Sequence, residues 1–429
     1  MDALTVTELG SLPSDWRVQR FDSLFAVQQG KQVSKKNRVG DNQRPFLRTK
    51  NVFWGRLDLA DLDEMHFTEA EEKRLALEPG DLLVCEGGDI GRTAIWHGEL
   101  ARCYYQNHLH RARLRDEAGD SRFALYWLWY AFEVGSVYFG RGNVTTIPNL
   151  SQSKLCELPL PVPPLPEQWK IAGVLGVVQQ AIEQQERLLQ LTAELKKTLL
   201  HQLFTQGLRG EPLKQTGIGP VPESWEVVEL GKISHKPEYG FTESAKPSGN
   251  AQFLRITDIQ EDGVRWESVP FCECPEELIE RYLLADNAVL FARIGATTGK
   301  NFLVKKPPVA VFASYLIRVR LRGEVSADFV SQFCDTRAYW RQIDTNKGNN
   351  LKGGINSSTL KRLLVPVPVD RTEQCAIADI FRQIDMKAAH TRRKRTALAD
   401  LFRTLLHQLM TAQIRVHDLD LSFLIASSA

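Results

Sequence analysis

The sequence has no apolar run that approaches the roughly 20 residues needed to span a membrane as a helix. Its N-terminus, MDALTVTELGSLPSDW, lacks the basic n-region and the apolar h-region of a signal peptide. The seven cysteines form no CxxC pair, and the closest two, Cys272 and Cys274, have no second ligand pair at zinc spacing. These absences predict a cytoplasmic protein with no membrane contact, no metal site and reduced, structural thiols.

Signatures of catalysis are also missing. The sequence contains no NPPF or DPPY tetrad of an amino-methyltransferase, no GxSxG and no HExxH. The segment GATTGK, Gly295 to Lys300, has three residues where a phosphate loop needs four between its first glycine and GK, and NFLVKK follows it. We therefore expect no catalytic residues, no cofactor bound by this chain and no enzymatic activity of its own.

The composition is that of an ordinary globular protein, with 43% hydrophobic and 25% charged residues. A formal net charge of +2 does not indicate nucleic acid binding, but a balanced total can hide a basic face on one domain. Composition alone neither supports nor excludes DNA as a partner.

The chain repeats itself over its length. TLLHQL stands at Thr198 to Leu203 and again at Thr404 to Leu409, 206 positions later. LPSDW near the start matches VPESW, which ends at Trp225, and FLR at Phe46 matches FLR at Phe253. Each unit is far longer than a solenoid repeat, so the sequence predicts two domain-sized copies related by a pseudo-two-fold repeat.

Two segments predict long helices. Residues 167 to 206 contain no proline and are rich in Gln, Glu, Lys and Leu, and the second copy has a matching segment. Forty helical residues extend roughly 60 Å. Steps of four and three residues trace an apolar seam on each helix, and two such seams can bury each other as an antiparallel coiled coil. The alternative is that each helix packs only on its own globular unit.

The seams and the repeated histidines define the residues expected in helix pairing or partner docking. They are Ile171, Leu175, Val178, Ile182, Leu189, Leu199, His201, Leu203, Ile377, Phe381, Ile384, Leu398, Phe402, Leu405, His407 and Leu409.

Prolines mark the entrance to each helix, in ELPLPVPPLPEQ and in LLVPVPVDRTEQ, and a Gly- and Pro-rich link follows the first helix. The predicted order is globe, helix, globe, helix. The boundaries are residues 1–160 for the first globe, 161–212 for the first helix and linker, 213–368 for the second globe, 369–415 for the second helix and 416–429 for a tail.

Inside the globes, short β-rich runs such as GDLLVCEGG and YLIRVRL alternate with glycine turns and with helical stretches such as SRFALYWLWYAFE. The predicted fold class is α+β, with two α/β globes separated by the long helices. The globes agree at these framework segments and differ between them, which indicates two related but different binding surfaces.

DNA recognition requires amide, hydroxyl and basic side chains on loops that reach base edges and phosphates. Such side chains recur at equivalent places in both globes, although each one alone is more often a solvated surface residue. The candidates are Arg48, Lys50, Asn51, Arg92, Gln106, Asn107, His108, Arg141, Asn143 and Thr145 in the first globe, and Arg255, Thr257, Arg293, Thr297, Lys300, Lys347, Asn349, Asn350 and Lys352 in the second. The basic run from His390 to Arg395 is equally well explained as the wet middle of a helical rod.

The order of these motifs, with PLPVPPLPEQ before a long helix ending in LLHQLFTQGLRG, a tryptophan-bearing restart in PVPESW and a second round ending in LLHQLM, resembles the specificity subunit of type I restriction-modification systems. The resemblance covers nearly the whole chain. The second helix departs from the pattern, since PVPVDRTEQ precedes it and Arg395 interrupts its seam.

That resemblance implies a noncatalytic subunit with two target recognition domains, each reading one half of a bipartite, asymmetric site in double-stranded DNA. It implies that the helices act as a spacer and dock two methyltransferase subunits, which carry S-adenosylmethionine, and that separate restriction subunits carry ATP and Mg²⁺. Whether two restriction subunits join this complex stays open. The competing hypotheses are a stand-alone methyltransferase or nuclease with an unrecognised site, and a coiled-coil adaptor for proteins only.

Overall fold

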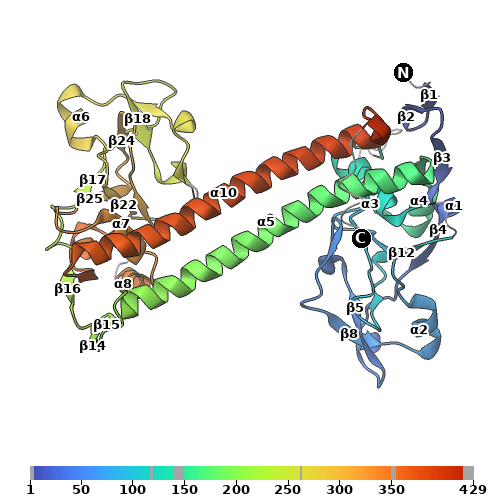
Figure 1. Ribbon diagram of the computed structural model, residues 1–429, viewed down its shortest axis with the longest axis horizontal. Helices are drawn as coiled ribbons and strands as arrows, with labels where there is room; N and C mark the ends of the chain where they lie inside the picture. The colour runs from blue at the N-terminus through green and yellow to red at the C-terminus, as the bar shows by residue number, and fades with distance from the viewer. Residues whose placement is uncertain (1–3, 116–118, 139–148, 261–262, 349–353, 419–429) are drawn as a thin grey trace. The chain divides into compact units, whose positions relative to one another are not determined.

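The computed structural model describes residues 4–115, 119–138, 149–260, 263–348 and 354–418. The described chain forms two compact units. Unit 1 contains residues 1–184 and 394–429, and unit 2 contains residues 185–393. Each unit therefore combines one globular segment with one end of each long helix, α5 (Leu165–Gln206) and α10 (Arg371–Met410) (Figure 1).

Unit 1 holds small mixed sheets with short helices around them. Its strands are β1 (Leu4–Thr7), β2 (Gly10–Pro13), β3 (Arg17–Arg20), β4 (Phe25–Gln29), β5 (Gln43–Leu47), β6 (Val52–Phe53), β7 (Arg56–Leu57), β8 (Asp63–His66), β9 (Leu82–Cys85), β10 (Thr93–Ile95), β11 (Tyr104–Tyr105), β12 (Leu109–Leu114) and β13 (Pro159–Val162). Its short helices are α1 (Phe21–Leu24), α2 (Glu69–Leu75), α3 (Ser121–Trp129) and α4 (Gln152–Glu157). A four-stranded sheet has the order β10-β9-β12-β4, and a three-stranded sheet has the order β11-β5-β8.

Unit 2 repeats this arrangement. Its strands are β14 (Leu213–Thr216), β15 (Gly219–Pro222), β16 (Trp225–Glu229), β17 (Glu238–Tyr239), β18 (Ala251–Leu254), β19 (Ile259–Gln260), β20 (Gly263–Val264), β21 (Phe271–Cys272), β22 (Val289–Ala292), β23 (Asn301–Leu303), β24 (Ala310–Phe312), β25 (Leu316–Val319) and β26 (Leu364–Pro368). Its short helices are α6 (Glu276–Tyr282), α7 (Ala327–Phe333), α8 (Arg337–Gly348) and α9 (Ser357–Lys361). The sheet orders β23-β22-β25-β17 and β24-β18-β21 match those of unit 1 strand for strand.

The register of the strands repeats as well. Leu109 pairs with Cys85 in unit 1, and Leu316 pairs with Ala292 in unit 2, so both partners are displaced by 207 positions. The α+β class and the internal repeat are confirmed, because the second unit reproduces the sheet orders and pairings of the first.

The ends of the long helices complete the core of each unit. In unit 1, Phe402 of α10 packs against Trp129 with ring centroids 4.8 Å apart, and Leu406 is fully buried in the same cluster as Ile171 of α5. In unit 2, Phe204 of α5 packs against Phe329 at 4.9 Å. The start of one helix lies with the end of the other, so the two helices are antiparallel within each unit.

The glutamate at the start of α5 joins this helix to the segment that follows α10. Glu167 accepts a hydrogen bond from the indole of Trp16 at 3.1 Å and two from the guanidinium of Arg415, at 2.8 and 3.0 Å. Its neighbour Gln168 accepts the backbone N–H of Asp120 at 3.0 Å and donates to the carbonyl of Pro163 at 2.9 Å.

The equivalent residues of unit 2 make the equivalent connections. Glu373 accepts the backbone N–H of Leu208, just after α5, at 2.9 Å. Gln374 accepts the N–H of Ser326 at 2.9 Å and donates to Pro368 at 2.9 Å. The Glu-Gln pair that follows each proline-rich segment therefore connects the start of its helix to the segment after the other long helix and to the residue before a short helix. We call this pair the clasp.

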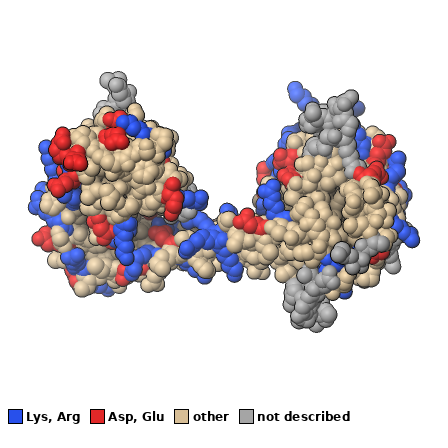
Figure 2. Space-filling model, turned by 90° about the horizontal axis from the view of Figure 1, so that it is seen from above, with Lys and Arg blue, Asp and Glu red and all other residues tan. Residues whose placement is uncertain are grey.

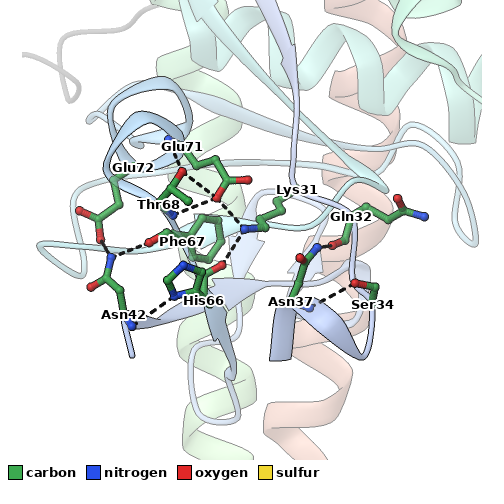
Figure 3. A network of polar contacts seen from close by, with 10 residues as sticks. All are labelled: Lys31, Gln32, Ser34, Asn37, Asn42, His66, Phe67, Thr68, Glu71 and Glu72. Carbon is green, nitrogen blue, oxygen red and sulfur yellow. Dashed lines mark hydrogen bonds and ion pairs between the residues drawn. The ribbon is translucent and has the colours of Figure 1, made fainter. Parts of the chain in front are cut away.

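Lys31 forms a buried ionic network that unit 2 replaces by apolar contacts. Its ammonium donates to Glu71 at 2.6 Å and to the carbonyl of His66 at 2.7 Å, and it lies over the ring of Phe67 (Figure 3). Both Lys31 and its counterpart Phe241 bridge to the strand connection before the central strand. Phe241 packs against Tyr282 instead, with ring centroids 5.3 Å apart.

We predict that Glu167→Gln destabilises unit 1, because Arg415 is largely buried and loses the more buried of its two carboxylate partners, while the more exposed Asp15 remains. The opening free energy of unit 1, from native-state hydrogen exchange resolved by peptide, should fall by about 2 to 4 kcal/mol. Glu157→Gln at the exposed end of α4, also in unit 1, is the matched control and should change it by less than about 0.5 kcal/mol. Equal effects of both changes would contradict the clasp.

A second prediction concerns Lys31. Lys31→Met leaves the Glu71 carboxylate without its cation and should lower the free energy of unfolding by about 2 kcal/mol, whereas Lys31→Met with Glu71→Leu should recover most of the loss. Methionine matches the length of lysine without crowding Phe67. Urea unfolding measures both, and Lys73→Met on the exposed face of α2 is the control.

The same variants test the pH dependence. Burial acts to raise the pKa of Glu71, but hydrogen bonds from Lys31 and Thr68 outweigh burial and hold this pKa below its usual value. Because the pKa is depressed in the folded state, the pair stabilises fully above the ordinary glutamate pKa, and this stability is lost as the pH falls through the folded-state value. The double variant should lack this acid-sensitive part of the stability, and an unchanged pH profile would contradict the assignment.

Candidate nucleic-acid interface

The connection into the central strand β12 is held by backbone hydrogen bonds from three directions. The N–H of Gln106 donates to Leu47 at 2.9 Å, and the N–H of Asn107 donates to Lys31 at 2.8 Å. The N–H of Leu109 closes the turn on the carbonyl of Gln106 at 3.0 Å. The backbone here is fixed independently of the side chains it presents.

Unit 2 makes the same bonds at the connection into β25. The N–H of Ala313 donates to Leu254 at 2.9 Å, and the N–H of Ser314 donates to Phe241 at 2.8 Å. A glycine allows the close approach in both units, since a Cβ on Gly30 would stand 2.2 Å from the carbonyl oxygen of Gln106 and one on Gly240 would stand 2.3 Å from that of Ala313.

The turn after the other central strand, β9 in unit 1 and β22 in unit 2, is hydrogen-bonded to the same connection. We call this repeated set of backbone hydrogen bonds the frame. In unit 1 the N–H of Glu86 donates to the carbonyl of His108 at 3.0 Å, and Glu86 in turn accepts the N–H of Leu150 at 2.8 Å. In unit 2 the N–H of Arg293 donates to Tyr315 at 3.0 Å and its carbonyl accepts the N–H of Ile355 at 2.9 Å. Two turns therefore meet at one edge of the four-stranded sheet in each unit, on the same backbone scaffold.

A short 3₁₀ turn follows β5 in unit 1, at Thr49–Asn51, and β18 in unit 2, at Ile256–Asp258. Asn51 is buried, and its amide is used within the turn, where it accepts the N–H of Arg48 at 2.9 Å and donates to two carbonyls at 3.0 Å. As packed, Asn51 is a structural residue of this turn and does not present its amide to DNA.

The basic residues of these turns are paired with carboxylates. Arg48 bonds Asp63 at 2.8 Å, Lys50 bonds Asp61 at 2.7 Å and Arg255 bonds Asp258 at 2.8 Å. The hydrogen bond from Lys50 lowers the pKa of Asp61, and the bond to Asp258 raises the pKa of Arg255. Exposed and partly exposed pairs of this kind add little stability, so a phosphate could replace the carboxylate at little cost.

The glycine turns that present Arg92 and Lys300 are hairpin connections. EGGDIGR joins β9 to β10, and GATTGK joins β22 to β23, so no helix follows the latter as a phosphate loop would require. Arg92 donates to Asp89 and to the carbonyl of Thr49, the latter at 2.7 Å, whereas Lys300 is exposed and carries no ion pair among the described residues. Thr297 is half-buried and lies in the same hairpin turn as Lys300.

The remaining candidates are placed unevenly. Gln106 is buried, Asn107 is half-buried, and His108 and Thr257 are exposed. Lys347 lies in α8, but its side chain falls outside what the structure describes. The other candidates outside the described residues are Arg141, Asn143, Thr145, Asn349, Asn350 and Lys352.

The residues predicted for helix pairing or partner docking differ in how far they are buried. Among the predicted pairing residues, the buried ones are Ile171, Leu175, Leu203, Ile377, Phe381, Phe402 and Leu409. The half-buried ones are Val178, Ile182, Leu189, Leu199, Ile384, Leu398 and Leu405. His201 is exposed, whereas His407 lies 5.8 Å from the ring of Tyr130, so the two histidines of the repeated TLLHQL have different surroundings.

The seam includes the buried residues Leu203 and Leu409 but misses two other buried leucines near the helix ends. Leu200 and Leu406 are buried, and each directly follows the seam residue Leu199 or Leu405. In unit 2, a polar contact also joins the two helices, because Lys196 bonds Asp385 at 2.8 Å.

Charge alone does not mark the interface. Among the described residues on the face in Figure 2, Lys and Arg are interspersed with Asp and Glu on both globular parts, and further Lys and Arg lie along the long helices. The run from His390 to Arg395 lies in the middle of α10. Cys272 and Cys274 are buried thiols, and burial raises the pKa of Cys272 to about 11.

Sequence reasoning missed Gln29, Glu86, Tyr239, Ser314 and Tyr315, which lie on the same frame as the predicted residues. The signal was present in part, since Ser314 and Tyr315 follow Asn107 and His108 by the repeat distance of 207. Glu86 and Arg293 are separated by the same distance of 207, but the hydrogen bonds that bring them beside the other connection cannot be read from the sequence.

None of the helices in the described part of the chain carries an apolar stretch long enough to cross a lipid bilayer.

Comparison with known proteins gives a consistent result. The family described as the type I restriction modification DNA specificity domain matches twice, at residues 13–193 and 222–399. The chain is 24% identical over 430 residues to the putative type I restriction enzyme MjaX specificity subunit of Methanocaldococcus jannaschii, covering 96% of each chain. It is 23% identical to the EcoKI specificity subunit of Escherichia coli, covering 89% of this chain and 84% of that protein.

Solved structures share the fold. The S subunit of the type I restriction-modification system of M. genitalium aligns with a TM-score of 0.61 at 17% identity, over 92% of this chain and 96% of its own. A chain from a structure concerned with complex assembly and conformational transition of the type I R-M system aligns with a TM-score of 0.52 at 16% identity, over 94% of this chain and 99% of its own. The two family matches each span a globe and most of its long helix, and the chain therefore belongs to the type I restriction modification DNA specificity family, as a specificity subunit with two target recognition domains.

Proposed function

We propose that this chain is the noncatalytic, DNA-reading and assembly subunit of a type I restriction-modification complex. Each unit reads one half of a bipartite, asymmetric site in double-stranded DNA. The observation that carries this proposal is the repeated frame, in which the same backbone hydrogen bonds present different side chains in the two units. A copied scaffold with changed side chains suits two half-sites of different sequence.

The proposal assigns chemistry to partner subunits. Two methyltransferase subunits dock on the long helices and bind S-adenosylmethionine, and restriction subunits, where they join, bind ATP and Mg²⁺. The curated relatives are named specificity subunits of restriction enzymes, which supports a role in choosing the DNA sequence. The same packing connections recur at the start of both helices, which supports two similar surroundings for docking.

The exchange of one globe tests the division of labour. Replacing residues 213–368 with the equivalent segment of another specificity subunit should change one half of the recognised site and leave the other half and its methylation intact. Methylated adenines mapped across the genome of cells that express the complex give the readout. A change in both halves would contradict two independent recognition domains.

The purified chain, without its partner subunits, tests the noncatalytic assignment. The purified chain without partners should leave duplex DNA uncut and unmethylated, while its binding weakens steeply as salt is raised because phosphate contacts release counterions. Methyl transfer or cleavage by the chain alone would overturn the assignment, and binding that ignores salt would favour a protein adaptor instead.

A further inference from the structure

Four positions in each unit occupy equivalent places on the repeated frame. Two lie in the connection into the central strand, one follows the neighbouring central strand, and one ends the edge strand of the same sheet. In unit 1 they are Gln29, Glu86, Asn107 and His108, and in unit 2 they are Tyr239, Arg293, Ser314 and Tyr315. We call these eight residues the reading set.

The backbone of the reading set is fixed, while its side chains are free to differ. Glu86 and Arg293 share both backbone bonds, to the neighbouring connection and from the returning chain at Leu150 or Ile355. Yet their side chains carry opposite charges. None of the four positions has the same residue type in the two units, although the framework strands around them correspond in order and register.

Exposed aromatic side chains support a binding role in unit 2. Tyr315 is 56% exposed and Tyr239 is 39% exposed, which leaves much of both rings open to solvent. Tyr239 lies beside Arg293, whose guanidinium is 4.9 Å from the centroid of the Tyr239 ring, and the backbone carbonyl of Tyr315 accepts the N–H of Arg293. Aromatic faces beside an arginine are suited to base stacking and to contact with the thymine methyl group.

Arg293 is oriented but little used by the protein itself. Among the described residues, its one polar side-chain contact is a long bond from Nη1 to the carbonyl of Ser314 at 3.4 Å, and its Nε is buried without a partner. Arg318 in the same sheet is the opposite case, since it bonds Glu238 and two backbone carbonyls at 2.6 to 3.2 Å. A stacked guanidinium with unused donors is prepared for a bidentate acceptor such as the O6 and N7 atoms of guanine.

Unit 1 presents different chemistry at the same places. The carboxylate of Glu86 lies 3.3 Å from the imidazole of His108, and the amide of Gln29 donates to the carbonyl of Asn107 at 2.9 Å. A carboxylate accepts from the amino group of cytosine, and an amide side chain pairs with adenine. The two units therefore offer different base-edge partners from one scaffold.

We propose that the reading set determines base preference, with Gln29, Glu86, Asn107 and His108 reading one half-site and Tyr239, Arg293, Ser314 and Tyr315 reading the other. This inference rests on the proposed function and specifies which side chains carry it. It ranks Arg293 above Arg255 as a base-reading residue, because Arg255 is already held by Asp258.

The test transplants the chemistry of unit 1 into unit 2. The chain carries Tyr239→Gln, Arg293→Glu, Ser314→Asn and Tyr315→His, it is assembled with its methyltransferase partners, and methylated sites are mapped in cells and with a randomised duplex library. The second half-site should change at one or more base pairs, with preference for the original bases falling about 10- to 100-fold. The first half-site should stay unchanged and serves as the internal control.

A single change guards against misfolding of the fourfold variant. Arg293→Gln keeps a polar side chain on the intact frame and should relax preference at one base pair of the second half-site by about 10-fold or more. Arg322→Gln is the matched control for Arg293→Gln, since Arg322 is exposed and follows the far end of β25. This control should lower overall DNA affinity at most, without altering the preferred sequence.

The outcomes separate the two proposals. If the parent complex methylates a defined bipartite site, and both the folded fourfold variant and Arg293→Gln methylate the same site with unchanged preference, the reading set is wrong while the proposed function stands. If the parent complex shows no sequence preference at all, the proposed function fails. A change in the first half-site would also overturn the assignment of residues to units.

Discussion

A buried glutamate at the start of each long helix is the interaction on which each unit depends. Glu167 binds Arg415 beyond the end of α10, and Glu373 binds the backbone of Leu208 beyond the end of α5. The adjacent glutamines tie the same helix starts to Pro163 or Pro368 and to the residue that caps α3 or α7. Both carboxylates are nearly inaccessible to water, so losing their partners would leave a buried charge uncompensated. The proline-rich motif and its Glu-Gln pair are therefore explained by packing rather than by ligand binding.

This clasp makes each unit depend on distant parts of the chain. The core of unit 1 contains Leu406, Leu409 and Met410, which the ribosome adds after all of unit 2 has been made. Contacts over such sequence separations require loop closure before they stabilise the fold, which slows folding. Unit 2 lies within one continuous segment, so it can complete its core first. The duplication therefore produced two units that are alike in structure but unequal in the order of their folding.

Much of this organisation could be predicted from the sequence, because it depends on repeats and on long periodic patterns. The two copies and both helices follow from residue spacing alone. The strict four-and-three steps failed near the helix ends, where Leu200 and Leu406 are buried, since a straight helix drifts about 20° per heptad from a 3.5-residue repeat. Local patterns also could not show that Asn51 is buried in its own turn. Its bonds to the carbonyls of Asp58 and Asp61 arise from the fold of the following loop.

In the frame, the backbone of a residue stabilises the fold while its side chain is free to serve recognition. At Glu86 and Arg293 the backbone N–H and C=O are both satisfied by bonds that any non-proline side chain permits, so the change of charge leaves the scaffold's hydrogen bonds intact. Lys31 and Phe241 show that an interior position beside the frame can also change, provided that its surroundings change with it from an ion pair to aromatic packing. Substitutions at the sheet edge need no such compensation where the side chain is exposed, as at His108 and Tyr315. Divergence should therefore accumulate at the edge positions faster than behind them, and a duplicated scaffold of this kind can acquire two different surfaces without losing its fold.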